Sequence, residues 1–147
     1  MKKYLLTFVL FFETIILIAQ SKPAYVLYNA KGKKVTYKKM IKQLIEKDVV
    51  LFGEFHNNPI SHWLELSVAK DLAGKKAITF GAEMFEADNQ QALNDYLAGK
   101  ITAKGLDSAV RLWSNYKTDY APLVNFAKEK NAPFIATNIH RRYAALV

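Results

Sequence analysis

The sequence predicts an α/β protein in which a mostly parallel sheet is flanked by helices. Three short apolar runs, at 49–54, 77–85 and 132–139, alternate with segments whose apolar residues recur at helical spacing. This alternation is typical of parallel strands joined by crossover helices. Near the N-terminus, two β-prone runs surround Gly32, which predicts a small β-hairpin ahead of the sheet.

Residues 1–19 have the layout of a secretory signal peptide. Lys2 and Lys3 precede an apolar stretch over 4–19, and a polar segment follows from Gln20. We expect cleavage after Ala19 and one domain over 20–147, with an uncleaved N-terminal anchor as the alternative. The expected location is the bacterial periplasm or the medium, with or without contact to a membrane.

The composition excludes several classes of protein. The chain has no cysteine, which rules out a disulfide framework, a thiolate metal site and a lipid-modified cysteine. Six lysines crowd into twelve residues: Lys31, Lys33, Lys34, Lys38, Lys39 and Lys42. No nucleic-acid recognition motif accompanies them, so we expect no nucleic-acid partner. A solvated face is the simpler interpretation, and an anionic ligand or lipid headgroup is the functional alternative.

Residues typical of helix caps and helix ends predict the bounds of the first two helices. Apolar residues at helical spacing over 37–47 predict a helix that Thr36 caps. Asn58 and Pro59 are typical of an N-cap and a first helical residue, and Gly74 closes that second helix.

Later signals predict the remaining helices. Asp88, with Gln91 three residues on, predicts a capped helix start, and further helices are expected over 106–113 and 121–130. Residues 143–147 resemble the start of a helix with no stop signal. We therefore expect 20–147 to be the N-terminal half of a longer, truncated domain, and a natural C-terminal helix is the alternative.

Polar, ionisable residues follow each predicted strand. Glu54 and His56 end the first, Glu83 ends the second, and Arg141 follows the third. In an open parallel sheet, ligands bind outside the carboxyl ends of the strands. Glu54 and His56 are two residues apart, so an extended backbone would point both side chains the same way. The sequence therefore predicts a site at this edge, with His62 close to its rim.

Each of these residues, considered alone, also has a structural explanation that needs no site. Glu54 could cap a helix or pair with a lysine, and His56 could bond to a backbone carbonyl. Asp107 and Asp119 are expected to be cap or surface residues. The convergence of Glu54, His56 and Glu83 on one edge favours a site.

Four local motifs resemble those of a known family. They are Gly-Glu-x-His with a second His six residues on, Glu-Met-Phe after the next strand, Trp-x-x-Tyr with a second Tyr, and Asn-x-x-Arg after the third: Gly53, Glu54, His56, His62, Glu83, Met84, Phe85, Trp113, Tyr116, Tyr120, Asn138 and Arg141. Over 47–147 the chain resembles the ChaN-like haem-binding family, which is related to the Tiki and TraB proteins and the erythromycin esterases.

The resemblance implies an exported protein of haem or iron uptake, with haem held between two copies. A homodimer and outer-membrane uptake components are the implied partners. The cofactor-binding residues would be His56, His62, Tyr116, Tyr120 and Arg141. A tyrosine can ligate haem iron as a phenolate, and cations suit the propionates.

A second interpretation is a hydrolase like those relatives. Glu54, His56 and Glu83 would then hold a divalent metal ion, or His56 would act as a base oriented by a carboxylate. No Gly-x-Ser-x-Gly or His-Glu-x-x-His motif is present. We favour haem binding without catalytic turnover.

Overall fold

The computed structural model describes residues 22–144, in two parts that meet between Val35 and Thr36. The expected signal peptide, residues 1–19, lies outside the described residues. Within 22–144, no helix combines the length and the apolar character needed to cross a bilayer. Each part is considered by itself.

The first part contains the predicted β-hairpin. β1 (Leu27–Tyr28) pairs antiparallel with β2 (Lys34–Val35). The side-chain oxygen of Asn29 accepts hydrogen bonds from two backbone N–H groups of the turn, at 3.0 Å each. Gly32 has a φ of 69°, a left-handed conformation that glycine adopts without steric cost. The hairpin predicted around Gly32 is therefore confirmed.

The second part opens with two helices that begin where the sequence predicts. Thr36 caps α2 (Tyr37–Leu44), where its hydroxyl accepts from the third backbone N–H of the helix. Asn58 caps α3 (Pro59–Ala73) by accepting from two backbone N–H groups of the first turn, and Gly74 ends this helix. Because the caps satisfy donors that a helix end leaves unpaired, they fix both starting points.

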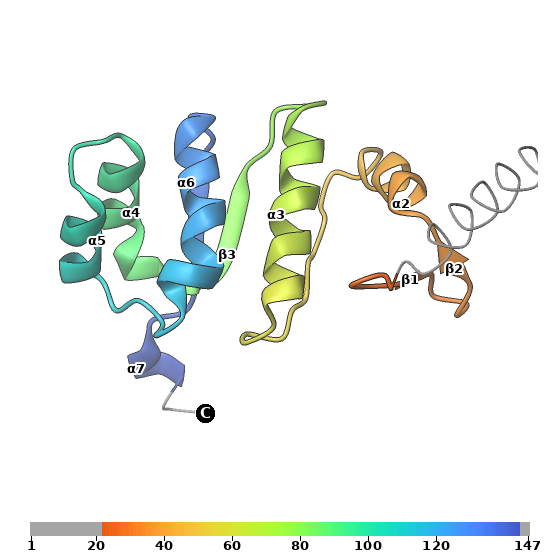
Figure 1. Ribbon diagram of the computed structural model, residues 1–147. Coiled ribbons are helices and arrows are strands. Elements are labelled where there is room, and N and C mark those ends of the chain that lie inside the picture. The colour runs from red at the N-terminus through yellow and green to blue at the C-terminus, as the bar shows by residue number, and fades with distance from the viewer. Residues whose placement is uncertain (1–21, 145–147) are drawn as a thin grey trace, which may run out of the picture. The chain divides into compact units, whose positions relative to one another are not determined.

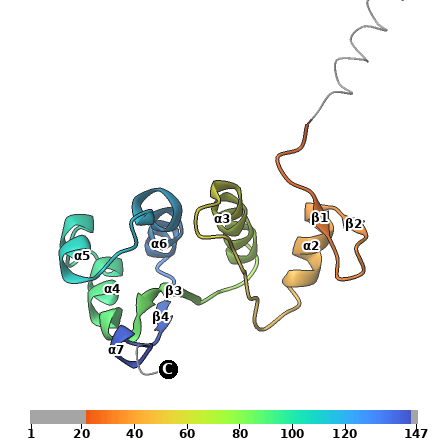
Figure 2. The ribbon, with the colours of Figure 1, turned by 90° about the horizontal axis from the view of Figure 1, so that it is seen from below.

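A parallel pair of strands forms the sheet of this part; the first is labelled in Figure 1, and both are labelled in Figure 2. β3 (Phe80–Glu86) pairs with β4 (Phe134–Asn138), and the register shifts between Ala82 and Glu86. This confirms the predicted parallel α/β class. Side chains alternate between buried and exposed along β4, where Ile135 is exposed. Helices cover one face of the pair (Figure 2).

The crossover between the two strands is helical. It comprises η1 (Ala87–Asn89), α4 (Gln90–Leu97), α5 (Ala103–Ala109), the π-helical turn η2 (Tyr116–Tyr120) and α6 (Ala121–Glu129), and α7 (Arg141–Ala144) follows β4. Its best-buried side chains, with Phe85 and Phe134 of the strands, form the core: Leu93, Leu106 and Val124.

Two predicted helix starts are wrong. Asp88 lies inside η1 and does not cap α4; its carboxylate accepts from the Asn89 side chain instead. The helix expected over 106–113 is α5, which begins earlier because the Thr102 hydroxyl accepts from the backbone N–H of Gly105. A local cap therefore outweighs the apolar pattern that follows it.

The apolar run Val49–Glu54 differs most from expectation, because it is not a strand. Within the described residues, its backbone makes no hydrogen bond to β3 or β4. Strand-like alternation persists in burial, since Val50 and Phe52 are half-buried while Leu51 is 92% exposed. All three residues line one side of a groove. The groove has a volume of about 750 Å³, and residues 76–81 line its other side. An apolar run needs a neighbour to become a strand, and this one has none among residues 22–144.

Candidate functional site

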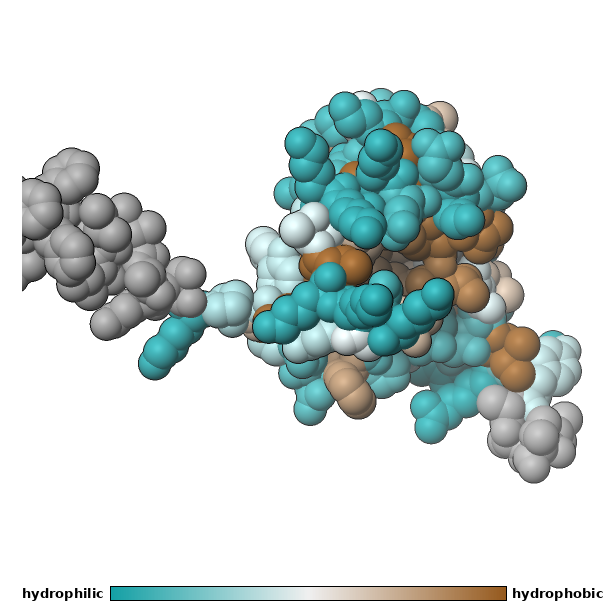
Figure 3. Space-filling model, turned by 90° about the vertical axis from the view of Figure 1, so that its right-hand side faces the viewer, coloured by the Kyte–Doolittle hydropathy of each residue, from teal (hydrophilic) through white to brown (hydrophobic). Residues whose placement is uncertain are grey.

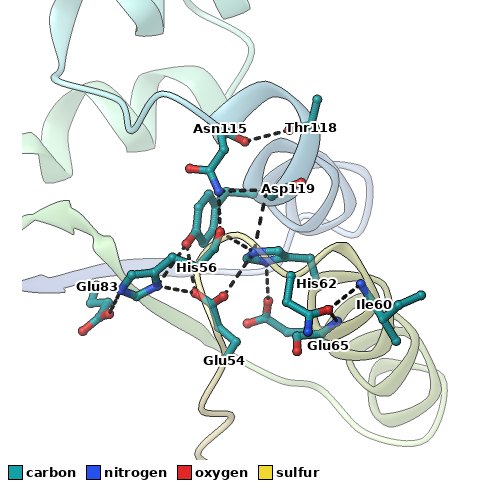
Figure 4. Close-up of polar contacts among 12 residues, drawn as sticks. Glu54, His56, Ile60, His62, Glu65, Glu83, Asn115, Thr118 and Asp119 are labelled. Carbon is teal, nitrogen blue, oxygen red and sulfur yellow. Dashed lines mark hydrogen bonds and ion pairs between the residues drawn. The ribbon is translucent and has the colours of Figure 1, made fainter. Parts of the chain in front are cut away.

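The site is assembled where the chain leaves Val49–Glu54 and enters α3. A turn closed by the backbone N–H of Asn58 and the carbonyl of Phe55, at 2.9 Å, reverses the chain after Glu54. The Asn58 cap then starts α3, whose first turn carries His62 inward. These local signals bring Glu54, His56 and His62 together, as the sequence predicts (Figure 4).

Glu54 is the centre of the cluster. Its side chain is 12% exposed, and one carboxylate oxygen accepts from the Tyr120 hydroxyl and from His56 Nδ1, both at 2.9 Å. The second oxygen lies 3.1 Å from His62 Nε2. One carboxylate therefore joins the turn before α3, the first turn of α3 and η2.

His62 is buried beneath this carboxylate. The residue is 5% exposed, and its Nε2 donates to the backbone carbonyl of His56 at 3.1 Å. Carboxylate oxygens of Glu65 and Asp119 each lie 3.9 Å from one of its ring nitrogens. The Tyr120 ring meets the imidazole edge to face, with centroids 4.7 Å apart. Three carboxylates thus surround one buried imidazole.

Two polar atoms of this cluster lack a hydrogen bond. Within the described residues, Glu54 Oε2 and His62 Nδ1 are buried without a hydrogen-bond partner. The contact between Glu54 Oε2 and His62 Nε2 is an ion-pair distance, because the His62 N–H points to the carbonyl of His56. Buried polar atoms without partners are costly, so native proteins retain few of them, and they concentrate where function demands it.

Burial also raises the pKa of two acidic groups of the cluster, the Glu65 carboxyl and the Tyr120 phenol. The pKa of Glu65 is raised, first by burial and then by repulsion from Glu54, while His62 opposes the shift. The pKa of Tyr120 is raised, first by burial and then by its hydrogen bond to Glu54. The Tyr120 phenol therefore stays protonated and serves as a donor to the carboxylate.

His56 is the member of the cluster that faces solvent. Its side chain is 56% exposed, its Nδ1 is held by Glu54, and its Nε2 lies 3.8 Å from Glu83 Oε1. The Trp113 ring meets it edge to face at 4.7 Å. The pKa of His56 is raised, and the hydrogen bond to Glu54 is the largest cause. An imidazolium with one N–H free is therefore favoured at the surface.

The backbone of His56 is fixed as firmly as its ring. Its carbonyl accepts from Asn115 Nδ2 as well as from His62, and Asn115 Nδ2 also donates to Asp119 at 2.8 Å. Asn115, the residue before η2, and Asp119, within η2, therefore cover the site from one side. We call these two residues the roof of the site.

The metal interpretation gains no support from this geometry. Glu54 and Glu83 lie against opposite nitrogens of the same imidazole, so a single ion cannot contact all three residues. Another trio, Glu86, Asp88 and His140, has ligand atoms within 4.8 Å. Both Glu86 oxygens are bound by Arg111, and His140 Nδ1 accepts from a backbone N–H, which leaves the proton on the nitrogen that faces Asp88. Arg111 and a backbone N–H therefore already engage Glu86 and His140.

The other predicted site residues lie in different surroundings. Tyr116 is buried, and burial raises its pKa, so the phenolate that iron would need is disfavoured there as it is at Tyr120. Arg141 lies beyond β4, where its backbone N–H donates to Glu86 and its side chain is exposed. The structure therefore brings Glu54, His56, His62, Glu83 and Tyr120 together, and Tyr116 lies in the core behind them.

Sequence reasoning missed three members of the site. Glu65 lies three residues after His62 on α3, and this spacing could have revealed it. Asn115 and Asp119 reach the site from η2, more than fifty residues away along the chain. Asp119, expected to be a cap or surface residue, is instead mostly buried against His62.

The arrangement suits anion binding better than base catalysis. A carboxylate beneath an imidazole orients the ring and favours its charged form. A charged imidazole cannot accept a proton, but its outward N–H can donate a charge-assisted hydrogen bond to an anion. The hydrolase interpretation thus loses its general base at a pH below the raised pKa of His56.

Comparison with known proteins yields one family and one fold neighbour. A family model described as haem-binding uptake, Tiki superfamily, ChaN, matches residues 40–147. The fold is similar to that of ChaN from Campylobacter jejuni, whose structure is described as showing cofacial haem binding; the TM-score is 0.67, and identity is 22% over 83% of this chain. The chain spans 51% of that protein's length. No curated protein sequence matches it.

Proposed function

This chain belongs to the ChaN family of haem-binding uptake proteins in the Tiki superfamily, and from that premise we propose that it binds haem at the carboxyl edge of its sheet. Its biological role would be haem or iron uptake after export directed by residues 1–19. Outer-membrane uptake components and a second copy of the chain are the proposed partners.

One observation carries the proposal: His56 is an exposed imidazole that Glu54 orients at 2.9 Å, a contact that favours the charged form of the ring. Haem propionates are carboxylates, and a charged imidazole N–H is a strong donor to them. Nε2 of His56 points outward, and the only carboxylate near it in residues 22–144 is Glu83, at 3.8 Å. Because Glu83 is 68% exposed, it can move aside for a propionate.

The surroundings of His56 fit the rest of the ligand. Phe55 is an exposed aromatic ring next to His56, and Trp113 packs against the imidazole, so both offer apolar surface to a porphyrin. Arg141 supplies a second cation: it begins α7, which follows the carboxyl end of β4 (Figure 1), and its guanidinium has no ion pair within the described residues.

Iron ligation calls for a different residue. The raised pKa that favours a protonated His56 makes it a poor axial ligand, and the buried Tyr116 and Tyr120 are disfavoured as phenolates. Tyr143 is half exposed at this edge, and its hydroxyl accepts from Arg142 at 2.7 Å. Of the tyrosines that the structure describes, Tyr143 fits axial ligation best.

Haemin titration of the full-length chain, followed by visible absorption, tests the proposal. We expect saturable binding with a Soret shift, and His56→Ala should weaken it by about tenfold to a hundredfold, the scale of one hydrogen bond to a charged group. His140→Ala is the matched control, because His140 is also a histidine near this edge but is engaged with Asp88. Equal affinity in all three proteins would refute the role of His56, and the absence of saturable binding to the wild type would refute haem binding.

A further inference from the structure

Most of the net charge of the chain lies in a short segment. Residues 22–45 contain seven lysines and no aspartate, glutamate or arginine. Residues 46–147 contain twelve basic and twelve acidic residues, so they are formally neutral. Charge asymmetry of this kind is typical of proteins that bind a polyanionic partner with one region.

Part of this segment is the amphipathic helix α2. Its apolar residues, Met40, Ile41 and Leu44, form one stripe, and none of them is fully buried. Lys38, Lys39 and Lys42 lie on the exposed remainder of the helix. The side of the molecule that bears α2 is hydrophilic with separate hydrophobic patches (Figure 3). A half-covered apolar stripe beside lysines is the pattern of helices that lie on lipid surfaces.

Among the residues that the structure describes, the lysines of this segment have no acidic partners. The lysines that form ion pairs within residues 22–144 are Lys100, Lys117 and Lys130, all outside 22–45. The hairpin carries three further exposed lysines, Lys31, Lys33 and Lys34. An extended charged plane can accept both clusters without a fixed arrangement between the hairpin and α2.

We propose that α2 docks on a membrane surface of anionic lipid, with the hairpin lysines adding to its affinity. Lysines near an anionic bilayer each contribute to binding as long as they lie within a Debye length of it. All seven basic residues are lysines, whereas recognition of nucleic-acid phosphates and bases relies heavily on the planar fork of arginine. The apolar stripe of α2 also has a role on a bilayer and none on a nucleic acid.

Vesicle co-sedimentation with the full-length chain tests this docking. The probes are phosphatidylcholine vesicles and vesicles in which part of that lipid is replaced by phosphatidylglycerol. We expect binding to the anionic vesicles alone, weakened by added salt. Replacing Lys38, Lys39 and Lys42 with Gln should weaken it by about tenfold or more.

A control triple variant isolates position from net charge. Replacing Lys75, Lys104 and Lys117 with Gln removes the same charge from exposed positions of the neutral region. It should bind anionic vesicles as the wild type does, and circular dichroism should show both variants folded. Equal loss in both triple variants would overturn the proposal, because binding would then follow net charge.

Two other outcomes would also overturn it. One is wild-type binding to duplex DNA that is tighter than binding to anionic vesicles at the same salt concentration. The other is loss of vesicle binding on replacement of Lys31, Lys33 and Lys34 with Gln while the α2 variant still binds, since the hairpin alone would then be the docking element.

Discussion

The two halves of residues 49–56 are adjacent in sequence and opposite in structure. Val49–Phe52 is apolar, yet it pairs with no strand among the described residues, and Leu51 is 92% exposed. Glu54 and His56 are polar, yet they are tied to α3 and η2 by short hydrogen bonds. Side-chain contacts, rather than sheet hydrogen bonds, therefore hold the site in this chain.

The two halves depend on different interactions for their structure. A strand needs a neighbour along its whole length, whereas a buried carboxylate needs only a few donors at one point. Glu54 finds those donors in Tyr120 and His56, and its second oxygen lies at ion-pair distance from His62. The site can consequently form even where the strand that leads into it is unpaired.

The largest expected effect comes from removing the central carboxylate. Glu54→Gln should lower the free energy of unfolding by about 2–3 kcal/mol, because the hydrogen bonds from Tyr120 and His56 and the ion-pair contact with His62 all lose the carboxylate charge. Urea denaturation measures this. Glu83→Gln is the control, since Glu83 touches the same imidazole from the solvent side and should change stability by less than about 0.5 kcal/mol. Equal losses of unfolding free energy would contradict the distinction between Glu54 as the buried partner of His56 and Glu83 as its solvent-exposed partner.

A smaller effect is expected at the roof of the site. Asn115→Ala removes the side-chain amide that donates to the His56 carbonyl and to Asp119. We expect a loss of about 1 kcal/mol in unfolding free energy, since His62 still donates to the same carbonyl. A loss as large as that of Glu54→Gln would show that η2, not Glu54, holds the site together.

Glu65 should behave in the opposite sense to Glu54. Its raised pKa means that the folded state holds the proton more tightly than the unfolded state does. This contribution to stability is present at low pH and is lost as the pH rises above the ordinary value of 4.5. At neutral pH, Glu65→Gln should therefore raise stability, by less than about 1 kcal/mol because the group is partly solvated. A clear destabilisation would indicate that His62 depends on Glu65.

The smallest change in unfolding free energy is expected in the apolar half, Val49–Phe52. Leu51→Ala should change the unfolding free energy by less than about 0.5 kcal/mol, because the side chain is almost fully exposed. Thermal and urea unfolding measure this. A loss of 2 kcal/mol or more, on the scale of a buried leucine, would show that the run is a covered strand in solution.

Local signals explain what the sequence could predict. The hairpin turn at Gly32, the caps Thr36 and Asn58 and the parallel pairing of two apolar runs depend on residues close together in the chain or on a repeating pattern. Glu54, His56 and His62 were found because polar residues followed apolar runs. Glu83 was found in the same way, although it lies within β3 and not at its end as predicted.

The features that were missed depend on distant contacts. Asn115 and Asp119 look like ordinary turn residues until η2 packs on His62. The pattern of Val49–Phe52 is that of a strand, but no pattern within a run reveals whether a neighbour will be present to pair with it. The burial that disfavours Tyr116 and Tyr120 as iron ligands also arises from tertiary packing alone.

The most direct test of the account is the pH dependence of haemin affinity in the wild type and His56→Ala. The hydrogen bond to Glu54 raises the pKa of His56, and the charged imidazole is the form that binds a propionate. Wild-type affinity should be highest below that raised pKa and should fall as the pH rises through it. His56→Ala should bind more weakly at low pH and show no such fall. Parallel pH profiles in the two proteins would contradict the account.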